Sequence, residues 1–337
     1  MMSEPKPVFV SGTNRSGTTL MYALLATHPN LSMVRRSDMW RYFYGQFGDL
    51  SQPENFERCL KAMLSYKRIV NLKPDPERIR QEFGQGEASY GRLFALIHQH
   101  NAEREGKTRW GDKSLHTEEY ADQIFSEFPQ ARLIHIIRDP RDRYASVLKR
   151  LNATSRRIGV DTVKWLASAR IARQAAERYP NCVLIVRYET LARQPEETLR
   201  QVCDFIGEPY TPEMLTMTGA PRYHKKGANT AFEKVKPGVI STRSIGRFRD
   251  VISSWEIAFI QTFCRRMMAE FEYELEPTRL SVNERLAYLA ALPPGLARMV
   301  RWLVWDKVSE LKGRPLREHR IVDDYYEVGS ISEIEPI

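Results

Sequence analysis

Two glycines and several hydroxyl residues gather in one short stretch that could bind an anion. The stretch follows the apolar residues Val8-Phe9-Val10, and its glycines are Gly12 and Gly17. Two glycines allow a tight turn whose successive N–H groups converge on an anion, at the positive end of the helix that follows. The segment that we predict to hold phosphate groups is Gly12-Thr13-Asn14-Arg15-Ser16-Gly17-Thr18-Thr19.

The glycine spacing is that of a nucleotide-binding P-loop, with one exception. Thr18 stands where the P-loop of ATP and GTP enzymes has a lysine. That lysine normally meets the outer phosphates of a triphosphate, so its absence argues against an ordinary ATP or GTP enzyme. Arg15, inside the turn, is the cation supplied instead.

Ionisable residues also gather at the ends of two predicted strands. Residues 108–116 predict a short strand that ends in a polar turn with Lys113 and His116. Residues 132–137 predict an apolar strand, with His135 in the core, that ends at Arg138-Asp139-Pro140-Arg141-Asp142-Arg143. An apolar strand followed by charged residues is typical of a central parallel strand, which delivers those residues to its carboxyl edge.

The elements that must position these residues alternate along the chain. Helices are predicted over 17–27, from about 141, and over 160–179, 196–206 and 253–271, with another strand at 182–186. This order predicts an α/β fold of the P-loop type, with three layers and a mostly parallel central sheet. We expect one α/β domain over residues 1–275, with a helical insertion at about 50–107 after the first βα unit. Residues 276–337 form a helical extension and tail, and residues 220–246 form a loop that closes over ligand.

The extension carries many apolar residues together with Trp302 and Trp305 over residues 282–312. We expect it to dock on the domain or on a second copy of the chain, because both tryptophans can pack there. Peripheral contact with an acidic membrane is the alternative.

Composition favours anionic ligands. Lys and Arg number 51 and Asp and Glu number 42, so the net charge is +9. This charge does not distinguish a nucleotide ligand from a nucleic acid, an acidic glycan or a membrane surface. Four scattered cysteines predict free thiols in a reducing compartment. No run is long enough to span a bilayer, and the first strand begins by Val8, so we expect a cytoplasmic protein without a signal peptide.

With these motifs in order, residues 7–271 resemble the sulfotransferases that use 3′-phosphoadenosine 5′-phosphosulfate (PAPS), above all bacterial and tyrosylprotein members. The resemblance thins between residues 49 and 107. The Gly12 to Leu20 stretch looks like the family's 5′-phosphosulfate loop, and Arg138 to Ser146 looks like its 3′-phosphate motif. Gly111-Asp112-Lys113-Ser114 lies between them.

The resemblance implies a role for each motif. Ser16, Gly17, Thr18 and Thr19 would hold the 5′-phosphosulfate, while Arg138 and Ser146 bind the 3′-phosphate, which suits the bidentate geometry of arginine. Arg150, one helical turn after Ser146, reinforces that site. Tyr188 lies near the nucleotide or packs in the core, and Arg243 in the late loop is the closing cation.

The implied reaction is sulfuryl transfer to a hydroxyl or amine, leaving adenosine 3′,5′-bisphosphate. Arg15 and Lys113 would stabilise charge on the departing phosphate without a metal, unless Lys113 instead forms a surface ion pair with Asp112. Asp38 and His116 are the candidate bases. The acceptor is a small molecule, glycan, lipid or peptide, not a nucleic acid, and a homodimer is compatible. A divergent P-loop kinase and an inactive nucleotide- or glycan-binding protein are the alternative functions.

Overall fold

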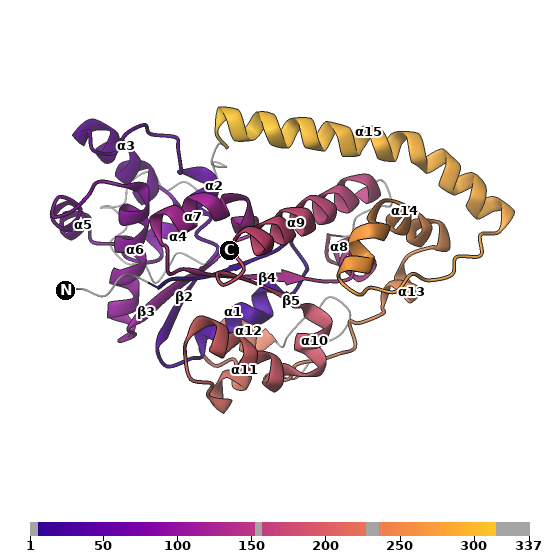
Figure 1. Ribbon diagram of the computed structural model, residues 1–337, viewed down its shortest axis with the longest axis horizontal. Helices are drawn as coiled ribbons and strands as arrows, with labels where there is room; N and C mark the ends of the chain where they lie inside the picture. The colour runs from indigo at the N-terminus through magenta and orange to yellow at the C-terminus, as the bar shows by residue number, and fades with distance from the viewer. Residues whose placement is uncertain (1–5, 152–156, 227–235, 237, 315–337) are drawn as a thin grey trace.

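Five parallel strands form the centre of the molecule (Figure 1), in the order β2-β3-β1-β4-β5. The structure is a computed structural model that describes residues 6–151, 157–226, 236 and 238–314. The strand bounds are β1 Val8–Ser11, β2 Leu31–Arg35, β3 Arg109–Lys113, β4 Arg132–Ile137 and β5 Val183–Arg187. The parallel sheet of an α/β fold is therefore confirmed.

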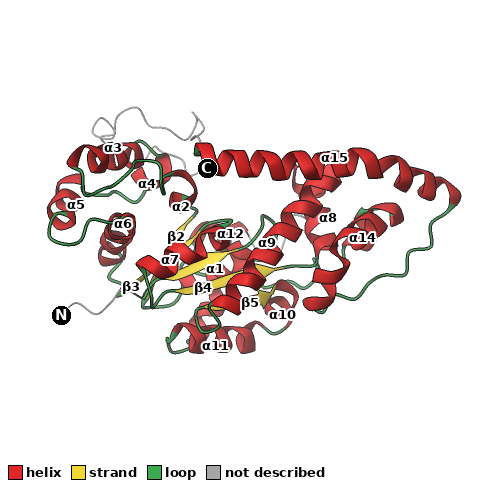
Figure 2. Ribbon diagram, turned by 45° about the horizontal axis from the view of Figure 1, so that its top comes forward, coloured by secondary structure: helices red, strands yellow, loops and turns green. Residues whose placement is uncertain are grey.

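Helices cover both faces of the sheet because its strands are buried on both sides (Figure 2). Val8 and Val10 pack on one face with helices α1, α10 and α11. Phe9 points to the other face, where the insertion and α7 pack. The bounds are α1 Thr18–Ala26, α7 Ala121–Glu127, α8 Pro140–Leu151, α9 Ile158–Arg178, α10 Tyr188–Arg193 and α11 Pro195–Ile206. The three predicted layers are present.

The helical insertion lies between β2 and β3, and its helices bury an aromatic core against the sheet. Its helices are α2 Met39–Tyr42, α3 Pro53–Leu64, α4 Lys67–Val70, α5 Pro76–Phe83 and α6 Tyr90–Arg104. Edge strand β2 was not predicted from the sequence. It exists through its pairing with β3, in which Leu31 lies opposite Arg109 and Arg35 opposite Lys113.

The polar region 220–246 begins with a short helix, α12 Pro221–Lys226, and residues 227–235 and 237 lie outside the described part. Two short 3₁₀ helices, η1 Thr117–Tyr120 and η3 Pro212–Thr216, connect other elements. Helix α13, Phe248–Val251, leads to α14, Ser254–Glu270, whose start is closed by a capping box between Ser253 and Glu256. The division of the chain at residue 275 stays a prediction.

The last described helix is α15, Val282–Lys312, which packs against α9 and α14 along one side of the molecule. Trp302 packs against the core that these helices share. Trp305 remains 56% exposed, so the helix docks on the domain through Trp302 but not through Trp305, and packing of Trp305 on a second copy of the chain stays a prediction. Residues 302 and 305 are neighbours on the helix surface, but Trp302 lies on the side that packs against the core and Trp305 lies on the exposed side. None of the described helices combines the length and apolarity that a bilayer crossing requires.

Candidate active site

The carboxyl edge of the sheet gathers the predicted functional residues. In register, Val10 of β1 lies opposite Lys113 of β3, and Ser11 lies opposite His135 of β4. The turn after β1, the turn after β3 and the arginine motif after β4 therefore leave the sheet side by side. Ligands of open α/β sheets bind outside this edge.

The turn from Gly12 to Gly17 is tight because three of its residues adopt positive φ. Gly12 and Gly17 have φ of 137° and 102°, and Arg15 has φ of 69°. The N–H of Ser16 donates to the carbonyl of Thr13 at 3.2 Å, and the hydroxyls of these two residues lie 2.6 Å apart. The turn thereby places two hydroxyls at the start of α1.

Close packing around positions 12 and 17 also leaves no room for a side chain. A Cβ on Gly12 would lie 2.5 Å from the carbonyl oxygen of Ile136, and one on Gly17 would lie 2.3 Å from Cδ2 of Tyr188. Real Cβ atoms do not approach so closely, so any other residue would push the turn away from β4 or from the Tyr188 ring. The Tyr188 ring therefore packs directly against the turn.

The N-terminus of α1 points its peptide groups toward this turn. Gly17 is the N-cap, and within the described chain no side chain caps this helix end and its first turn carries no acidic residue. The first N–H groups of a helix have no partner inside the helix and carry partial positive charge. The N–H groups at Thr18 and Thr19 are thus suited to an anion.

Arg15 joins the two motifs that the sequence separates. Its Nε donates a hydrogen bond to Oγ of Ser146 on α8 at 3.0 Å. Nη1 of Arg138 donates to the carbonyl of Arg15 at 3.1 Å. Ser146 is fully buried and Arg138 is 2% exposed. The predicted 5′-phosphosulfate loop and the predicted 3′-phosphate motif therefore form one continuous cluster.

Three guanidinium groups give this cluster its charge. Burial lowers the pKa of Arg15, and the nearby charges of Arg138 and Arg150 lower it further. Arg150 is exposed, one turn beyond Ser146 on α8. Nε of Arg138 is buried without a hydrogen-bond partner among the described residues. Closely spaced cations and an unsatisfied buried donor are both stabilised by an anion.

The late loop covers the cluster from one side. Nη2 of Arg138 donates to the carbonyl of Ser244 at 2.7 Å, and the guanidinium lies 4.7 Å from the centre of the Tyr188 ring. The hydroxyls of Tyr188 and Ser244 are 2.7 Å apart. Arg243 is the exposed neighbour of Ser244. The structure thus brings the predicted loop residue close to the predicted phosphate site.

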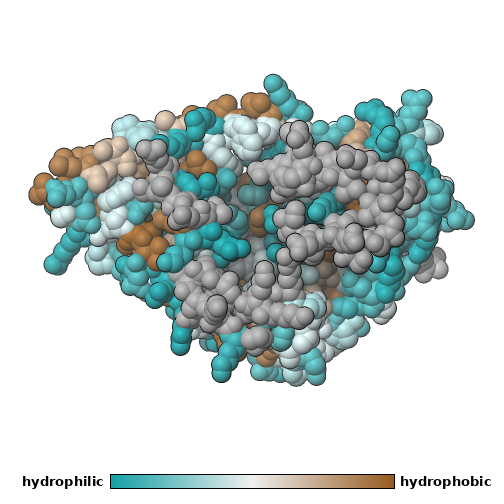
Figure 3. Space-filling model, turned by 180° about the vertical axis from the view of Figure 1, so that it is seen from behind, coloured by the Kyte–Doolittle hydropathy of each residue, from teal (hydrophilic) through white to brown (hydrophobic). Residues whose placement is uncertain are grey.

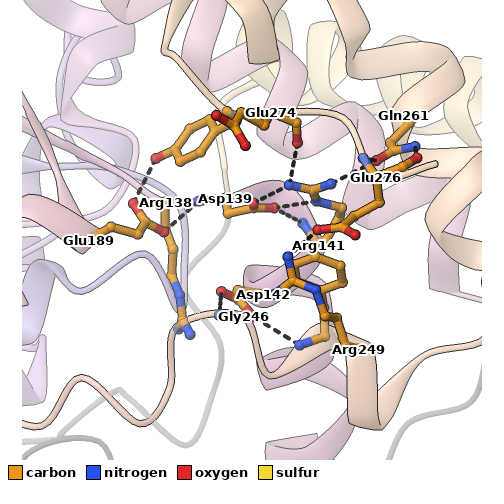
Figure 4. A network of polar contacts seen from close by, with 12 residues as sticks. Arg138, Asp139, Arg141, Asp142, Glu189, Gly246, Arg249, Gln261, Glu274 and Glu276 are labelled. Atoms are coloured by element: carbon orange, nitrogen blue, oxygen red, sulfur yellow. Dashed lines mark hydrogen bonds and ion pairs between the residues drawn. The ribbon is translucent and has the colours of Figure 1, made fainter.

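The other charged residues of the arginine motif hold the surrounding backbone (Figure 4). Asp139 pairs with Arg141 at 2.6 Å, and its own N–H donates to Glu189 at 3.0 Å. Asp142 accepts the N–H groups of Gly246 and Phe248 at 2.6 and 2.9 Å. Burial raises the pKa of Asp142 and of Glu189. Sequence reasoning missed these positioning roles, because nothing in the sequence pairs residue 142 with 246 or residue 139 with 189.

Arg143 is a second missed residue, and it anchors the cradle itself. Its fully buried guanidinium donates to the carbonyl and to Oδ1 of Asn14, at 3.1 and 2.6 Å. It also bonds the carbonyl of Asp161 and pairs with its carboxylate at 3.2 Å. The available signal was the cluster of three arginines at 138, 141 and 143, since buried arginines need such partners.

Lys113 ends β3 and is 2% exposed. Burial lowers its pKa to about 7, and the charges of Arg36 and Arg35 add to the effect. The surface ion pair with Asp112 is not what the structure holds. Asp112 is fully buried and instead accepts from Ser114 at 2.6 Å. Lys113 is therefore a buried amino group at the carboxyl edge of the sheet, with a pKa near neutral pH.

The two candidate bases lie on either side of β3. Asp38 is buried, its N–H donates to Oγ of Ser114 at 2.9 Å, and its carboxylate raises the pKa of Lys113. His116 has φ of 64°, and its Nδ1 lies 3.0 Å from a carboxylate oxygen of Glu119. Asp38 therefore lies beside Lys113, whereas His116 is tied to an acidic partner.

Another acidic residue lies under the cradle. Glu118 is 1% exposed and accepts hydrogen bonds from the hydroxyls of Ser11 and Ser168. Nδ1 of the buried His135 lies 3.9 Å from it. Across the described part of the chain, no group of three or more His, Cys, Asp or Glu is placed to hold a metal ion, and metal-free chemistry stays a prediction.

Comparison with known proteins shows a family match that includes the residues at this edge of the sheet. A family model described as "Sulfotransferase family" matches residues 7–212. The chain is similar to protein-tyrosine sulfotransferase A of Caenorhabditis elegans, with 25% identity over 62% of this chain and 51% of that protein. It is similar to carbohydrate sulfotransferase 2 of Mus musculus, with 34% identity over 27% of this chain and 17% of that protein. The chain thus spans about half or less of the length of these two relatives.

Solved structures agree with the fold. The sulfotransferase domain of the Synechococcus PCC 7002 olefin synthase superposes with a TM-score of 0.52 and 20% identity, over 81% of this chain and 98% of that domain. The sulfotransferase domain from the curacin biosynthetic pathway has the same TM-score of 0.52 at 17% identity, over 81% of this chain and 99% of that domain. At these identities the likeness concerns the fold.

Proposed function

The chain belongs to the sulfotransferase family, and from this premise we propose that it transfers a sulfuryl group from PAPS to a hydroxyl or amine of an acceptor. The observation that carries the proposal is the hydrogen bond from Arg15 to Ser146. It joins the turn proposed for the 5′-phosphosulfate to the helix proposed for the 3′-phosphate. A single adenosine that carries phosphate groups at both its 3′ and 5′ positions can bind the turn and the helix together.

The residues present fit such a nucleotide. Nε of Arg138 is a buried donor that a phosphate oxygen would satisfy. The glycines allow the tight turn of the cradle, since a side chain at either position would collide with Ile136 or Tyr188. We propose that Arg138, Ser146 and Arg150 hold the 3′-phosphate. The 5′-phosphosulfate is held by Gly12, Thr13, Asn14, Arg15, Ser16, Gly17, Thr18 and Thr19.

Arg15 can keep its contact with Ser146 when the nucleotide binds. The Ser146 hydroxyl accepts from Arg15 and still has its own proton to donate to a phosphate oxygen. The backbone of Arg15 is held by Arg138. When bound, the donor supplies an activated sulfuryl group whose transfer leaves negative charge on the departing phosphate oxygen. Arg15 and Lys113 then stabilise that charge, more strongly than they stabilise the donor before transfer.

Asp38 and His116 are both proposed as the group that takes the acceptor's proton. Asp38 has the stronger support, because its carboxylate raises the pKa of Lys113 and so lies within the same electrostatic environment. Its side chain also lies 3.6 Å from Arg68. His116 can accept a proton through the ring nitrogen that does not face Glu119.

Surroundings on the acceptor side favour an acceptor with an anionic group. Arg35 and Arg36 both act on Lys113 as positive charges. A small molecule, glycan, lipid or peptide can meet this description, and Arg243 would close the site over the nucleotide. We propose a cytoplasmic enzyme, supported by four cysteines that are all free thiols.

The experiment that tests the donor site compares two nucleotides. Calorimetry of the intact chain should give tighter binding of adenosine 3′,5′-bisphosphate than of adenosine 5′-monophosphate. Ser146→Ala should weaken the bisphosphate about tenfold and leave the monophosphate unchanged, because one hydrogen bond to a charged group is lost. Ser51→Ala, an exposed serine of the insertion, is the matched control.

Two further measurements separate the alternatives. Stabilisation by ATP with magnesium, without stabilisation by the bisphosphate, would contradict the sulfotransferase and favour the kinase. Transfer of labelled sulfuryl from the donor to a panel of phenols, sugars, lipids and peptides then tests turnover. Tight bisphosphate binding with no transfer to any acceptor would indicate the inactive binding protein.

A further inference from the structure

An apolar stripe runs along the outward face of α15. Its residues follow one another at steps of three or four positions, with one step of seven from Leu289 to Leu296, so they lie on one side of the helix. Val300 is 58% exposed and Leu289 is 59% exposed, whereas apolar residues on the packed side of a helix are buried. The members of the stripe are Val282, Leu286, Leu289, Leu296, Val300, Val304, Val308 and Leu311.

The opposite face of α15 fixes the helix on the domain. Gly295 is buried so closely that a Cβ on it would lie 2.6 Å from the Phe259 ring, and a Cβ on Gly159 of α9 would lie 2.3 Å from the carbonyl oxygen of Gly295. Met299 and Trp302 pack into the core shared with α9 and α14. Because this face is committed to the domain, the helix cannot turn to hide its stripe.

Charges on α15 are distributed unevenly. Arg285, Arg301 and Lys312 are exposed basic residues. The acidic residues serve other contacts: Glu284 closes the capping box with Ser281, Asp306 bonds Arg314 at 3.0 Å, and Glu310 pairs with Lys307 at 2.8 Å. The rim of the stripe is therefore basic, and the exposed indole of Trp305 adds an amphipathic ring beside it.

We propose that α15 lies flat on an anionic membrane surface, with the stripe buried among the acyl chains and the basic residues at the headgroups. An amphipathic helix with an apolar face and a basic rim binds such a surface. Figure 3 shows brown residues along the upper left edge of the molecule, where α15 lies in that view, so the stripe is accessible to a planar surface. At 1.5 Å per residue the 31-residue helix is about 46 Å long, enough for an extended contact.

Charge argues for lipid over a second copy of the chain. Two stripes packed against each other would bring two basic rims together, and like charges at an interface oppose association. An anionic bilayer neutralises the same residues. This inference does not depend on the transfer reaction.

Vesicle flotation of the full chain tests the proposal. We expect the wild-type chain to float with phosphatidylcholine vesicles that contain about a third phosphatidylglycerol, and to stay unbound with phosphatidylcholine alone. The variant Leu289→Ser/Val300→Ser/Val304→Ser should bind the anionic vesicles at least about tenfold more weakly, because three apolar side chains that insert among the acyl chains are lost. Arg285→Glu/Arg301→Glu should weaken binding similarly, and salt should reduce wild-type binding.

Leu275→Ser is the matched control, since Leu275 is exposed but lies before α15, and it should float as the wild type does. All variants should keep the wild-type melting temperature, because the substituted side chains are exposed. Failure of the wild-type chain to float, or equal flotation of the triple variant, would overturn the proposal. A dimer in light scattering that the triple variant abolishes, without vesicle binding, would show that a second copy covers the stripe.

Discussion

The guanidinium of Arg15 donates to the hydroxyl of Ser146 across 131 positions of sequence, at 3.0 Å. Each residue belongs to a motif that could be recognised separately, and their contact makes the two motifs one site. The carbonyl of Arg15 is also held by Arg138. Arg15 is thus held through its backbone by one motif residue and bonds another through its side chain.

We expect Arg15→Ala to lower kcat about a hundredfold, as removal of one group that stabilises transition-state charge does. Arg15→Lys should recover part of the loss, because lysine restores the positive charge but lacks the planar set of donors of the guanidinium group. Steady-state transfer with the best acceptor of the panel measures both. Arg200→Ala, an exposed arginine of α11, is the control, and a similar loss there would contradict the assignment.

Gly17→Ala should destabilise the chain by about 3 kcal/mol or more, because it adds a positive-φ strain and a collision with Tyr188. Gly207→Ala separates the two causes. Gly207 has φ of 73° with nothing within 4 Å of its added Cβ, so it should cost about 1 kcal/mol. Urea unfolding of both variants is the measurement, and equal losses would show that the Tyr188 contact is unimportant.

Lys113 should make both stability and nucleotide binding depend on pH. Its folded pKa of about 7 lies below the usual value of about 10.4 in an unfolded chain. Between these values the unfolded chain holds the extra proton, so the contribution of Lys113 to folding improves as pH rises and is least favourable below pH 7. Lys113→Met should remove this part of the pH dependence in unfolding experiments.

An anionic nucleotide reverses the shift, since it favours the charged lysine. We expect binding of adenosine 3′,5′-bisphosphate at pH 8 to take up a proton, detected by calorimetry in two buffers with different ionisation enthalpies. Lys113→Met should abolish the uptake, whereas Lys61→Met, an exposed lysine of α3, should retain it. Uptake that survives in Lys113→Met would place the proton elsewhere.

Arg143→Met should destabilise the chain by about 3–5 kcal/mol, because the buried carboxylate of Asp161 loses a partner. Arg157 also contacts Asp161, but its side chain is 40% exposed, so its compensation is small. Adding Asp161→Asn should restore part of the stability in urea unfolding by removing the buried charge. A second substitution that worsens the loss would contradict this explanation.

Asp38→Asn and His116→Ala distinguish the two bases. The true base should lose at least about a hundredfold in kcat while the affinity for the bisphosphate stays unchanged. The other variant should keep kcat within a few-fold of the wild type. Pre-steady-state turnover and calorimetry on the same samples give the two quantities. Loss of kcat in neither variant would exclude both residues.

Local sequence was sufficient for the parallel fold and for the cradle. The glycines at 12 and 17, the apolar strands and the charged residues that follow them act over a few positions, where backbone conformation and burial follow from residue type. Helix ends were also predictable, as at Gly207, which closes α11 in a left-handed conformation.

Only the tertiary structure decided how these pieces meet. Strand β2 is a strand because β3 pairs with it. Arg143 is an anchor because Asn14 and Asp161 come to it. Trp302 packs on the domain while Trp305 is exposed, because α15 docks through Gly295 and Met299. Such contacts join residues far apart in the chain, and residue type at one position carries no information about which distant backbone will lie beside it.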